Sequence, residues 1–141
     1  AGPAGRRLFA WLAEAGITED DFRRHAYIAA ISRCYPGPAR SGRGDRVASP
    51  AERALCAPWL VRERELVAPH LLIPVGRVAI DEIIGKAPLA EIVGGPLEVG
   101  GATILPLPHP SGASAWANAP ENRAKVSAAL RWLGTWWHRV P

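Results

Sequence analysis

The sequence LLIPVGRVAIDEIIG, residues 71–85, decides the fold of this chain. Its first five residues form a short apolar run without charge, which is typical of a buried β-strand. Gly76 and Arg77 provide a turn. Residues 78–84 have helical character, and Gly85 stands where a helix ends. A strand that leads through a glycine directly into a helix predicts one crossover unit of an α/β fold.

Further strands and helices are predicted on both sides of this unit. Residues 27–32 and 102–107 are short apolar runs with strand character. Ser49 followed by Glu52 is the N-terminal signature of a helix that runs to about Ala68. Two more helices are predicted, over residues 6–15 with Gly16 at the end and from Pro120 onward. This alternation predicts a three-layer α/β/α domain with a short parallel central sheet.

The composition limits the size and the class of the protein. With 141 residues and 48% hydrophobic content, the chain is long enough for one domain with a core and too short for two ordinary ones. Its formal net charge is +4, and all of the 17 basic residues except Lys86 and Lys125 are arginines. Arginine suits phosphate contacts, although a GC-rich coding sequence has the same effect. The sequence has neither a signal-peptide pattern nor an apolar run of bilayer length, so we expect a soluble, cytoplasmic protein without a membrane partner.

A proline-rich loop, LPLPHPSGAS over residues 105–114, follows the last predicted strand. The prolines on either side of His109 fix its backbone, whereas Ser111 and Gly112 keep N–H groups that can approach an anion. Open α/β sheets bind ligands at the edge where their strands end, and the Gly76 turn would share that edge. His109 is therefore a candidate functional residue, although an ordinary surface histidine in a turn has the same pattern.

Cys34 and Cys56 are the two cysteines of the sequence. This number does not make the dense disulfide framework of a small secreted protein. The residues alone leave two possibilities, buried structural thiols or metal ligands, and two thiolates cannot complete a tetrahedral metal site.

Several segments resemble the uracil-DNA glycosylase superfamily, most closely its bacterial and archaeal iron–sulfur branches. They occur in the right order and cover most of the chain. The segments are AGPAGRRL at residues 1–8, YIAAISRC at 27–34, RVASPAE leading to CAPWL at 46–60, and HPS at 109–111. The resemblance implies a single domain over residues 1–141 with the α/β fold of this superfamily, lacking its N-terminal part and with it the first strand of the sheet.

The resemblance also implies a DNA glycosylase of base excision repair, which hydrolyses the N-glycosidic bond of a deaminated base flipped out of DNA. His109 would donate a hydrogen bond to the leaving base, on which negative charge builds as the bond stretches. Ser111 and Gly112 would hold a backbone phosphate, although each would equally fit a plain loop. The next residues would approach the gap left by the extruded nucleotide through Ala113, Ser114 and Trp116.

Other loops receive roles from the same resemblance. Gly76 and Arg77, at a predicted helix N-terminus, would face DNA phosphate, although Arg77 would also fit a solvated surface. Cys34 and Cys56 would supply two of the four ligands of a [4Fe–4S] cluster, whose first pair would lie upstream. Nonspecific attraction to phosphate would come from Arg40, Arg43 and Arg46.

The sequence departs from the family's pattern in two respects. The turn that positions the attacking water and the aromatic residue that stacks on the base would both precede Ala1, so we predict that residues 1–141 alone are inactive and poorly folded. Ala30 stands in the base pocket, where many relatives have an asparagine, and its side chain has no hydrogen-bonding group. The preferred base, uracil or another such as hypoxanthine or xanthine, is therefore left open.

Two other functions fit parts of the sequence. A noncatalytic module of the same fold that recognises lesions in DNA would account for Ala30 and for the absent water-positioning turn. An α/β enzyme that acts on a small phosphorylated metabolite would use His109 but leaves the arginine-rich loop without a role. The leading hypothesis is the glycosylase, acting as a monomer on DNA that contains a deaminated base.

Overall fold

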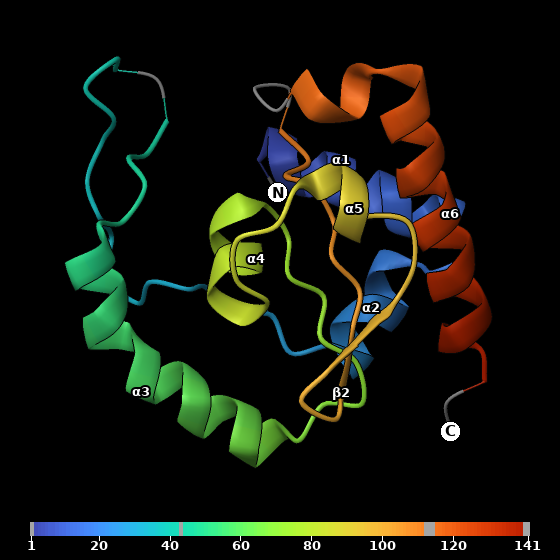
Figure 1. The fold of residues 1–141 in the computed structure, drawn as a ribbon, viewed down its shortest axis with the longest axis horizontal. Helices are drawn as coiled ribbons and strands as arrows, with labels where there is room; N and C mark the ends of the chain where they lie inside the picture. Colours follow the sequence, from blue (N-terminus) through green and yellow to red (C-terminus); the bar gives the residue numbers. More distant parts are fainter. Residues whose placement is uncertain (1, 43, 112–114, 140–141) are drawn as a thin grey trace. The chain divides into compact units, whose positions relative to one another are not determined.

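The computed structural model describes residues 2–42, 44–111 and 115–139. Helices and a small sheet occur together, as the α/β class requires (Figure 1). The elements are α1 (Pro3–Glu14), α2 (Glu19–His25), α3 (Pro50–Val67), α4 (Arg77–Ile83), α5 (Leu89–Ile92), β1 (Leu97–Val99), β2 (Ala102–Ile104), the 3₁₀ helix η1 (Ala115–Asn118) and α6 (Pro120–Trp137).

The chain falls into two compact units. The first unit comprises Ala1–Ala26 and His70–Pro141, and the second comprises Tyr27–Pro69. The main hydrophobic cluster lies in the first unit. Among the described residues, no helix has both the length and the apolar character that crossing a bilayer requires.

Helices α1 and α6 pack side by side in the first unit (Figure 1). Gly134 of α6 permits this approach, because a Cβ built there would overlap the carbonyl oxygen of Ala15. At the end of α6, Trp137 stacks on Phe22, and its Nε1 donates to the carboxylate of Asp21 at 2.7 Å. The buried residues of this core are Trp11, Leu12, Ala15, Ile17, Phe22, Val93, Leu105, Leu107, Ala117, Val126, Ala129, Leu130 and Leu133.

The predicted helix ends are confirmed where the sequence carries local signals. Gly16 and Gly85 follow α1 and α4 with φ of +78° and +95°, a backbone conformation that favours glycine. Ser49 and Glu52 form a reciprocal capping box at the start of α3. Helix α6 begins at Pro120, as expected, because proline suits the first turn of a helix.

Residues 71–75, predicted as a strand, form only isolated bridges, and of the strand predicted over residues 102–107 only Ala102–Ile104 is regular; the two segments run parallel. The N–H of Gly76 donates to the carbonyl of Leu107 at 2.9 Å, so the pairing continues to the end of the first segment. Parallel neighbours end at the same edge, and the Gly76 turn therefore lies beside the His109 loop. Two parallel bridges join the segments, between Leu72 and Ile104 and between Val75 and Leu107.

The structure also contains elements that the sequence pattern does not predict. Strand β1 pairs antiparallel with β2 across Gly100 and Gly101, which have φ of +57° and +82°. Two consecutive glycines with positive φ suit a two-residue hairpin turn. Helix α2 is capped by Thr18, whose side chain accepts the N–H of Asp21 at 3.1 Å. Helix α5 is a single turn.

The prediction of a strand over residues 27–32 is wrong. These residues have no regular secondary structure, and the side chains of Tyr27 and Ile28 are 58% and 61% exposed. Their composition suits a strand, but a strand also needs a neighbour that pairs with its N–H and C=O groups. No such pairing occurs for this segment within the described part of the chain.

Candidate active site

One exposed side chain stands out in the proline-rich loop. Residues 105–108 and Pro110 are buried, whereas His109 is exposed. Leu105 and Leu107 belong to the hydrophobic core, so packing anchors the loop in addition to the ring constraints of its prolines. The loop therefore presents one imidazole from a backbone that has little freedom.

Ser111 makes two contacts with the Nδ1 atom of His109. Its backbone N–H donates to Nδ1 at 3.1 Å, and its Oγ lies 2.8 Å from the same atom. Because a backbone N–H can only donate, Nδ1 must be the acceptor and carries no proton in this arrangement. The neutral imidazole then carries its proton on Nε2. The exposed ring therefore has a hydrogen-bond donor at Nε2.

Gly76 lies against the ring of His109. A Cβ built at Gly76 would be 2.9 Å from Cδ2 of His109 and 3.2 Å from its Cβ. The N–H of Gly76 is occupied by the carbonyl of Leu107 and does not face an anion. The structure thus brings two of the predicted site residues into direct contact.

Arg77 begins α4 and is bound by neighbouring groups. Its Nη1 donates to the carbonyl of Ala87 at 2.7 Å, and its Nε lies 3.2 Å from Oδ1 of Asp81. With Lys86 and Pro88, these residues line a shallow pocket. A DNA phosphate would therefore compete with Asp81 for the guanidinium group.

The segment expected to contact DNA after Ser111 is described only in part. Gly112, Ala113 and Ser114 lie outside the described residues. Trp116 is half-buried in η1, and its carbonyl accepts a hydrogen bond from Nδ2 of Asn122 at 2.9 Å. This bond ties η1 to the first turn of α6.

Cys34 and Cys56 both lie in the second unit, where Cys34 is exposed and Cys56, in α3, is buried. The N–H of Arg33, the residue before Cys34, donates to Sγ of Cys56 at 3.3 Å. The Arg33 side chain also forms an ion pair with Glu63 of α3. The hydrogen bond to Sγ and the ion pair together bring the Cys34 loop to α3. Among the described residues, no three His, Cys, Asp or Glu side chains gather in a group that would hold a metal ion.

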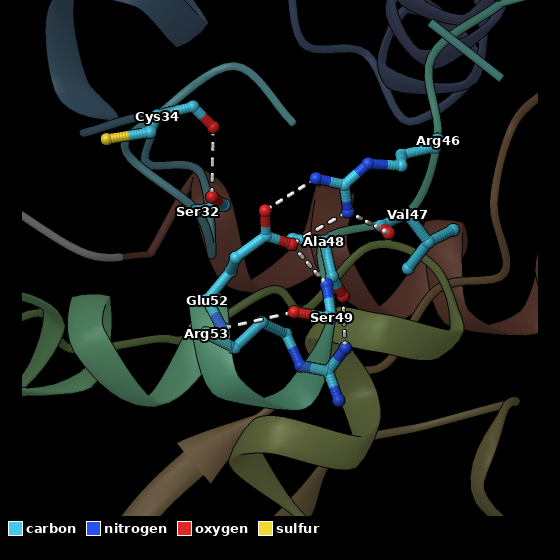
Figure 2. A network of polar contacts seen from close by, with 8 residues as sticks. All are labelled: Ser32, Cys34, Arg46, Val47, Ala48, Ser49, Glu52 and Arg53. Carbon is cyan, nitrogen blue, oxygen red and sulfur yellow. Dashed lines mark hydrogen bonds and ion pairs between the residues drawn. The ribbon is translucent and has the colours of Figure 1, made fainter. Parts of the chain in front are cut away.

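An ion pair between Arg46 and Glu52 holds the loop after Cys34 against the start of α3 (Figure 2). Nη1 and Nη2 of Arg46 donate to the two carboxylate oxygens at 2.7 and 2.5 Å. The same carboxylate accepts the N–H of Ser49 at 2.7 Å. These hydrogen bonds, with that of Arg46 the strongest influence, lower the pKa of Glu52 to about 2. The Arg46 guanidinium therefore holds the loop to the start of α3. The resemblance predicts a contact of Arg46 with DNA phosphate.

Two more predicted residues of the second unit are exposed. Arg40 lies in the hairpin that the bridge between Pro38 and Asp45 closes, and Ala30 lies in the irregular segment after α2. Arg43 lies outside the described residues. Ala30 and the cysteines therefore belong to one unit, and His109, Gly76 and Ser111 belong to the other.

The comparison with protein families gives one match that covers nearly the whole chain. The family model described as the Uracil DNA glycosylase superfamily matches residues 1–134. The chain belongs to this superfamily. The Type-4 uracil-DNA glycosylase of Thermotoga maritima is 28% identical over 113 residues, which are 78% of this chain and 54% of that protein. The DNA polymerase of Bacillus phage SP01 is 27% identical over 110 residues, 78% of this chain and 11% of the polymerase.

The chain thus spans about half the length of the first uracil-DNA glycosylase relative and about a tenth of the phage polymerase. Within this superfamily member, sequence patterns point to the His109 loop but miss the contacts that hold the ring. The glycine directly after a buried strand is a signal for close backbone approach, and it would have suggested the contact of Gly76. The pair of Arg46 and Glu52 has no such signal, because the two residues are six positions apart across a loop.

Proposed function

We propose that this protein is a DNA glycosylase of base excision repair, which hydrolyses the N-glycosidic bond of uracil or another deaminated base flipped out of DNA. The observation that carries the proposal is the hydrogen bond from the backbone N–H of Ser111 to Nδ1 of His109, which leaves Nε2 as the donor of the neutral ring. Membership of the superfamily supports it. The name of the Thermotoga maritima relative, a uracil-DNA glycosylase, supports uracil as a substrate base.

The proposed chemistry follows from where charge develops. The bond between C1′ and the base nitrogen breaks, and the electron pair leaves with the base. Negative charge therefore grows on a carbonyl oxygen of the base, and positive charge grows on the sugar. The Nε2–H of His109 would donate to that oxygen, in a hydrogen bond that strengthens toward the transition state. Water then gives its hydroxide to C1′ and its proton to solvent or to the base anion, while His109 keeps its own proton.

The rigid loop suits this role. A donor stabilises a transition state when it is already aimed at the atom that becomes charged, because no reorganisation is then needed during the reaction. Three features restrict His109: the flanking prolines, the buried residues 105–108, and the bond from Ser111. His109 is thus the proposed electrophile. No described residue is proposed to activate the attacking water.

DNA contacts are proposed for the residues that surround His109. Ser111 and Gly112 would approach a backbone phosphate, and Arg77 would contribute where the phosphate displaces Asp81. Gly76 is itself buried, and its proposed contribution to DNA contact would pass through the His109 ring that lies against it. The positive net charge of the chain supports an anionic partner. The contacts proposed at the gap in the duplex are Ala113, Ser114 and Trp116.

A layered arrangement of helices around a parallel sheet is proposed together with the function. Residues 1–141 would form one three-layer α/β/α domain around a short parallel sheet. The parallel bridges at Leu72 and Val75 support this arrangement. In it, the Gly76 and His109 loops would lie at the ligand-binding edge.

A [4Fe–4S] cluster is proposed as cofactor, and the residues present fit half of its ligand set. Such a cluster is held by four thiolates, and the hydrogen bond from the N–H of Arg33 to Sγ of Cys56 brings the Cys34 loop to α3. Bound by Cys34 and Cys56, the cluster would cross-link this loop to the helix, and no step of base release passes through it.

The function is tested by release of the free base from oligonucleotides that carry uracil, hypoxanthine or xanthine. The full-length protein would be used in excess over single-stranded and duplex DNA, so that one turnover is measured. Release of any of the three bases supports the proposal. Binding of all three lesions without release of a base contradicts it and favours a noncatalytic lesion-binding module.

Ala30 provides a matched variant for the base preference. Ala30→Asn adds an amide that can pair with the uracil edge and is expected to raise the ratio of uracil to hypoxanthine release by about tenfold. An unchanged ratio would show that residue 30 does not read the base.

A further inference from the structure

We propose that Gly76 is a positioning residue: because it has no Cβ, the imidazole of His109 can pack directly against its Cα. The inference depends on the proposed function in one respect, the role of His109 as the electrophile. A Cβ at Gly76 would lie 2.9 Å from Cδ2, 3.2 Å from Cβ and 3.4 Å from Cγ of His109. Separations below 3.0 Å are essentially never found between a Cβ and such an atom, so any side chain at residue 76 displaces the ring.

The backbone on both sides of Gly76 is held in place. Its N–H donates to the carbonyl of Leu107 at 2.9 Å, only two residues before His109. Its carbonyl accepts the N–H of Ile80 at 3.0 Å in the first turn of α4. Gly76 has a φ of +87°, which a residue with a Cβ rarely adopts. Gly76 therefore cannot move away from the ring without breaking its hydrogen bond with Leu107 or that with Ile80.

The contact reaches the part of the ring that matters for the proposed chemistry. Cδ2 is bonded directly to Nε2, the donor nitrogen, and the opposite edge of the ring is held at Nδ1 by Ser111. Pressure on Cδ2 would shift Nε2 and pull Nδ1 away from Ser111. Gly76 and Ser111 thus restrain opposite edges of one imidazole, and the donor lies between these restraints.

The protein offers a matched control for the test. Gly85 ends α4 with a φ of +95°, close to that of Gly76, and a Cβ built there meets nothing within 4 Å. Gly85→Ala therefore also places a Cβ on a residue with positive φ, without touching His109. Gly76→Ala combines such a Cβ with the ring displacement.

The first measurement is the ¹⁵N NMR spectrum of His109 in the full-length protein. The unaltered protein should show the tautomer protonated at Nε2. Gly76→Ala should move the ¹⁵N chemical shifts of both ring nitrogens toward those of a mixture of tautomers. Gly85→Ala should leave these shifts unchanged. Ring signals of Gly76→Ala that match those of Gly85→Ala would overturn the proposal.

The second measurement is single-turnover base release at saturating enzyme. Gly76→Ala is expected to lower the rate by about 100-fold, because a displacement of about 1 Å has an effect of this size. In the His109→Ala background, the same substitution should cause no further loss, since the ring is already absent. An equal loss in both backgrounds would overturn the proposal.

The two measurements separate this inference from the proposed function. If the unaltered protein releases no base, the proposed function fails, and the ring signals still decide whether Gly76 positions His109. If Gly76→Ala does not fold, the thermal unfolding of the double variant, Gly76→Ala with His109→Ala, tests the contact instead. Recovery of the melting transition supports the contact, and persistent loss of it contradicts the contact.

Discussion

The backbone N–H of Ser111 donates a hydrogen bond to Nδ1 of His109 at 3.1 Å, within the same loop. In many sites a carboxylate or a carbonyl accepts from Nδ1–H and leaves Nε2 as the acceptor. Here the polarity is reversed, since a main-chain donor occupies Nδ1 and Nε2 carries the proton. The orientation and the tautomer of His109 are thus set by the residue two positions later.

Ser111→Ala separates the two contacts that Ser111 makes. The variant loses Oγ, which lies 2.8 Å from Nδ1, but keeps the backbone N–H. We expect base release to fall by no more than about tenfold, the size of one ordinary hydrogen bond. The ¹⁵N shifts of His109 should still report a proton on Nε2. A loss as large as that of His109→Ala would mean that Oγ, and not the N–H, holds the ring.

The lowered pKa of Glu52 makes the stability of the second unit depend on pH. Its pKa is lowered from 4.5 to about 2, chiefly by the hydrogen bond from Arg46, so the folded state favours the charged carboxylate. The stabilisation is fully present above pH 4.5 and is lost as the pH falls through 2. Glu52→Gln removes the charge at every pH. The difference in urea midpoint between the two proteins should therefore be largest near neutral pH and should shrink toward about pH 2.

Glu65→Gln is the control for this prediction. Glu65 also pairs with an arginine of α3, Arg62, at 2.9 Å, but both side chains are more than half exposed. Such a surface pair contributes little to stability. Its substitution should therefore leave the midpoint nearly unchanged. If the difference in urea midpoint between the unaltered protein and Glu52→Gln stays constant across the acid range, the lowered pKa of Glu52 is contradicted.

Local signals explain which parts of the fold the sequence predicts. The helix that begins after Ser49 and the glycines that end α1 and α4 depend on residues within one turn, so the pattern locates them correctly. Residues 27–32 have strand composition but no pairing partner, and pairing is a nonlocal property that composition does not contain. The turn at Gly100 and Gly101 carried a local hairpin signal that would have revealed β1.

The candidate site shows the same division. The flanking prolines single out His109 because their effect on the backbone is local. Its contact with Gly76 joins segments 33 positions apart and depends on the parallel pairing that ends at Leu107. The bond from Ser111 is local, yet it depends on the rotamer of His109, which the sequence does not state.

Gly134→Ala tests the close packing of α1 and α6. Alanine favours a helix over glycine by about 1 kcal/mol, so an unconstrained site would gain stability. A Cβ at residue 134 overlaps the carbonyl oxygen of Ala15, and we expect a net loss of roughly 1–3 kcal/mol in the free energy of unfolding. The reverse substitution at an exposed position of the same helix, Ala124→Gly, gives the propensity scale. A stabilised Gly134→Ala protein would show that the helices are not in contact there.

The most direct test of the central claim is the single-turnover rate of base release by the full-length protein and by its His109→Ala variant, on the lesion that the protein prefers. The loss of one preorganised donor to a developing oxyanion should lower the rate by about 100- to 1000-fold. DNA affinity should stay the same, since Nε2–H acts mainly in the transition state. A variant that releases the base within about twofold of the unaltered rate would contradict the assignment of His109 as the electrophile.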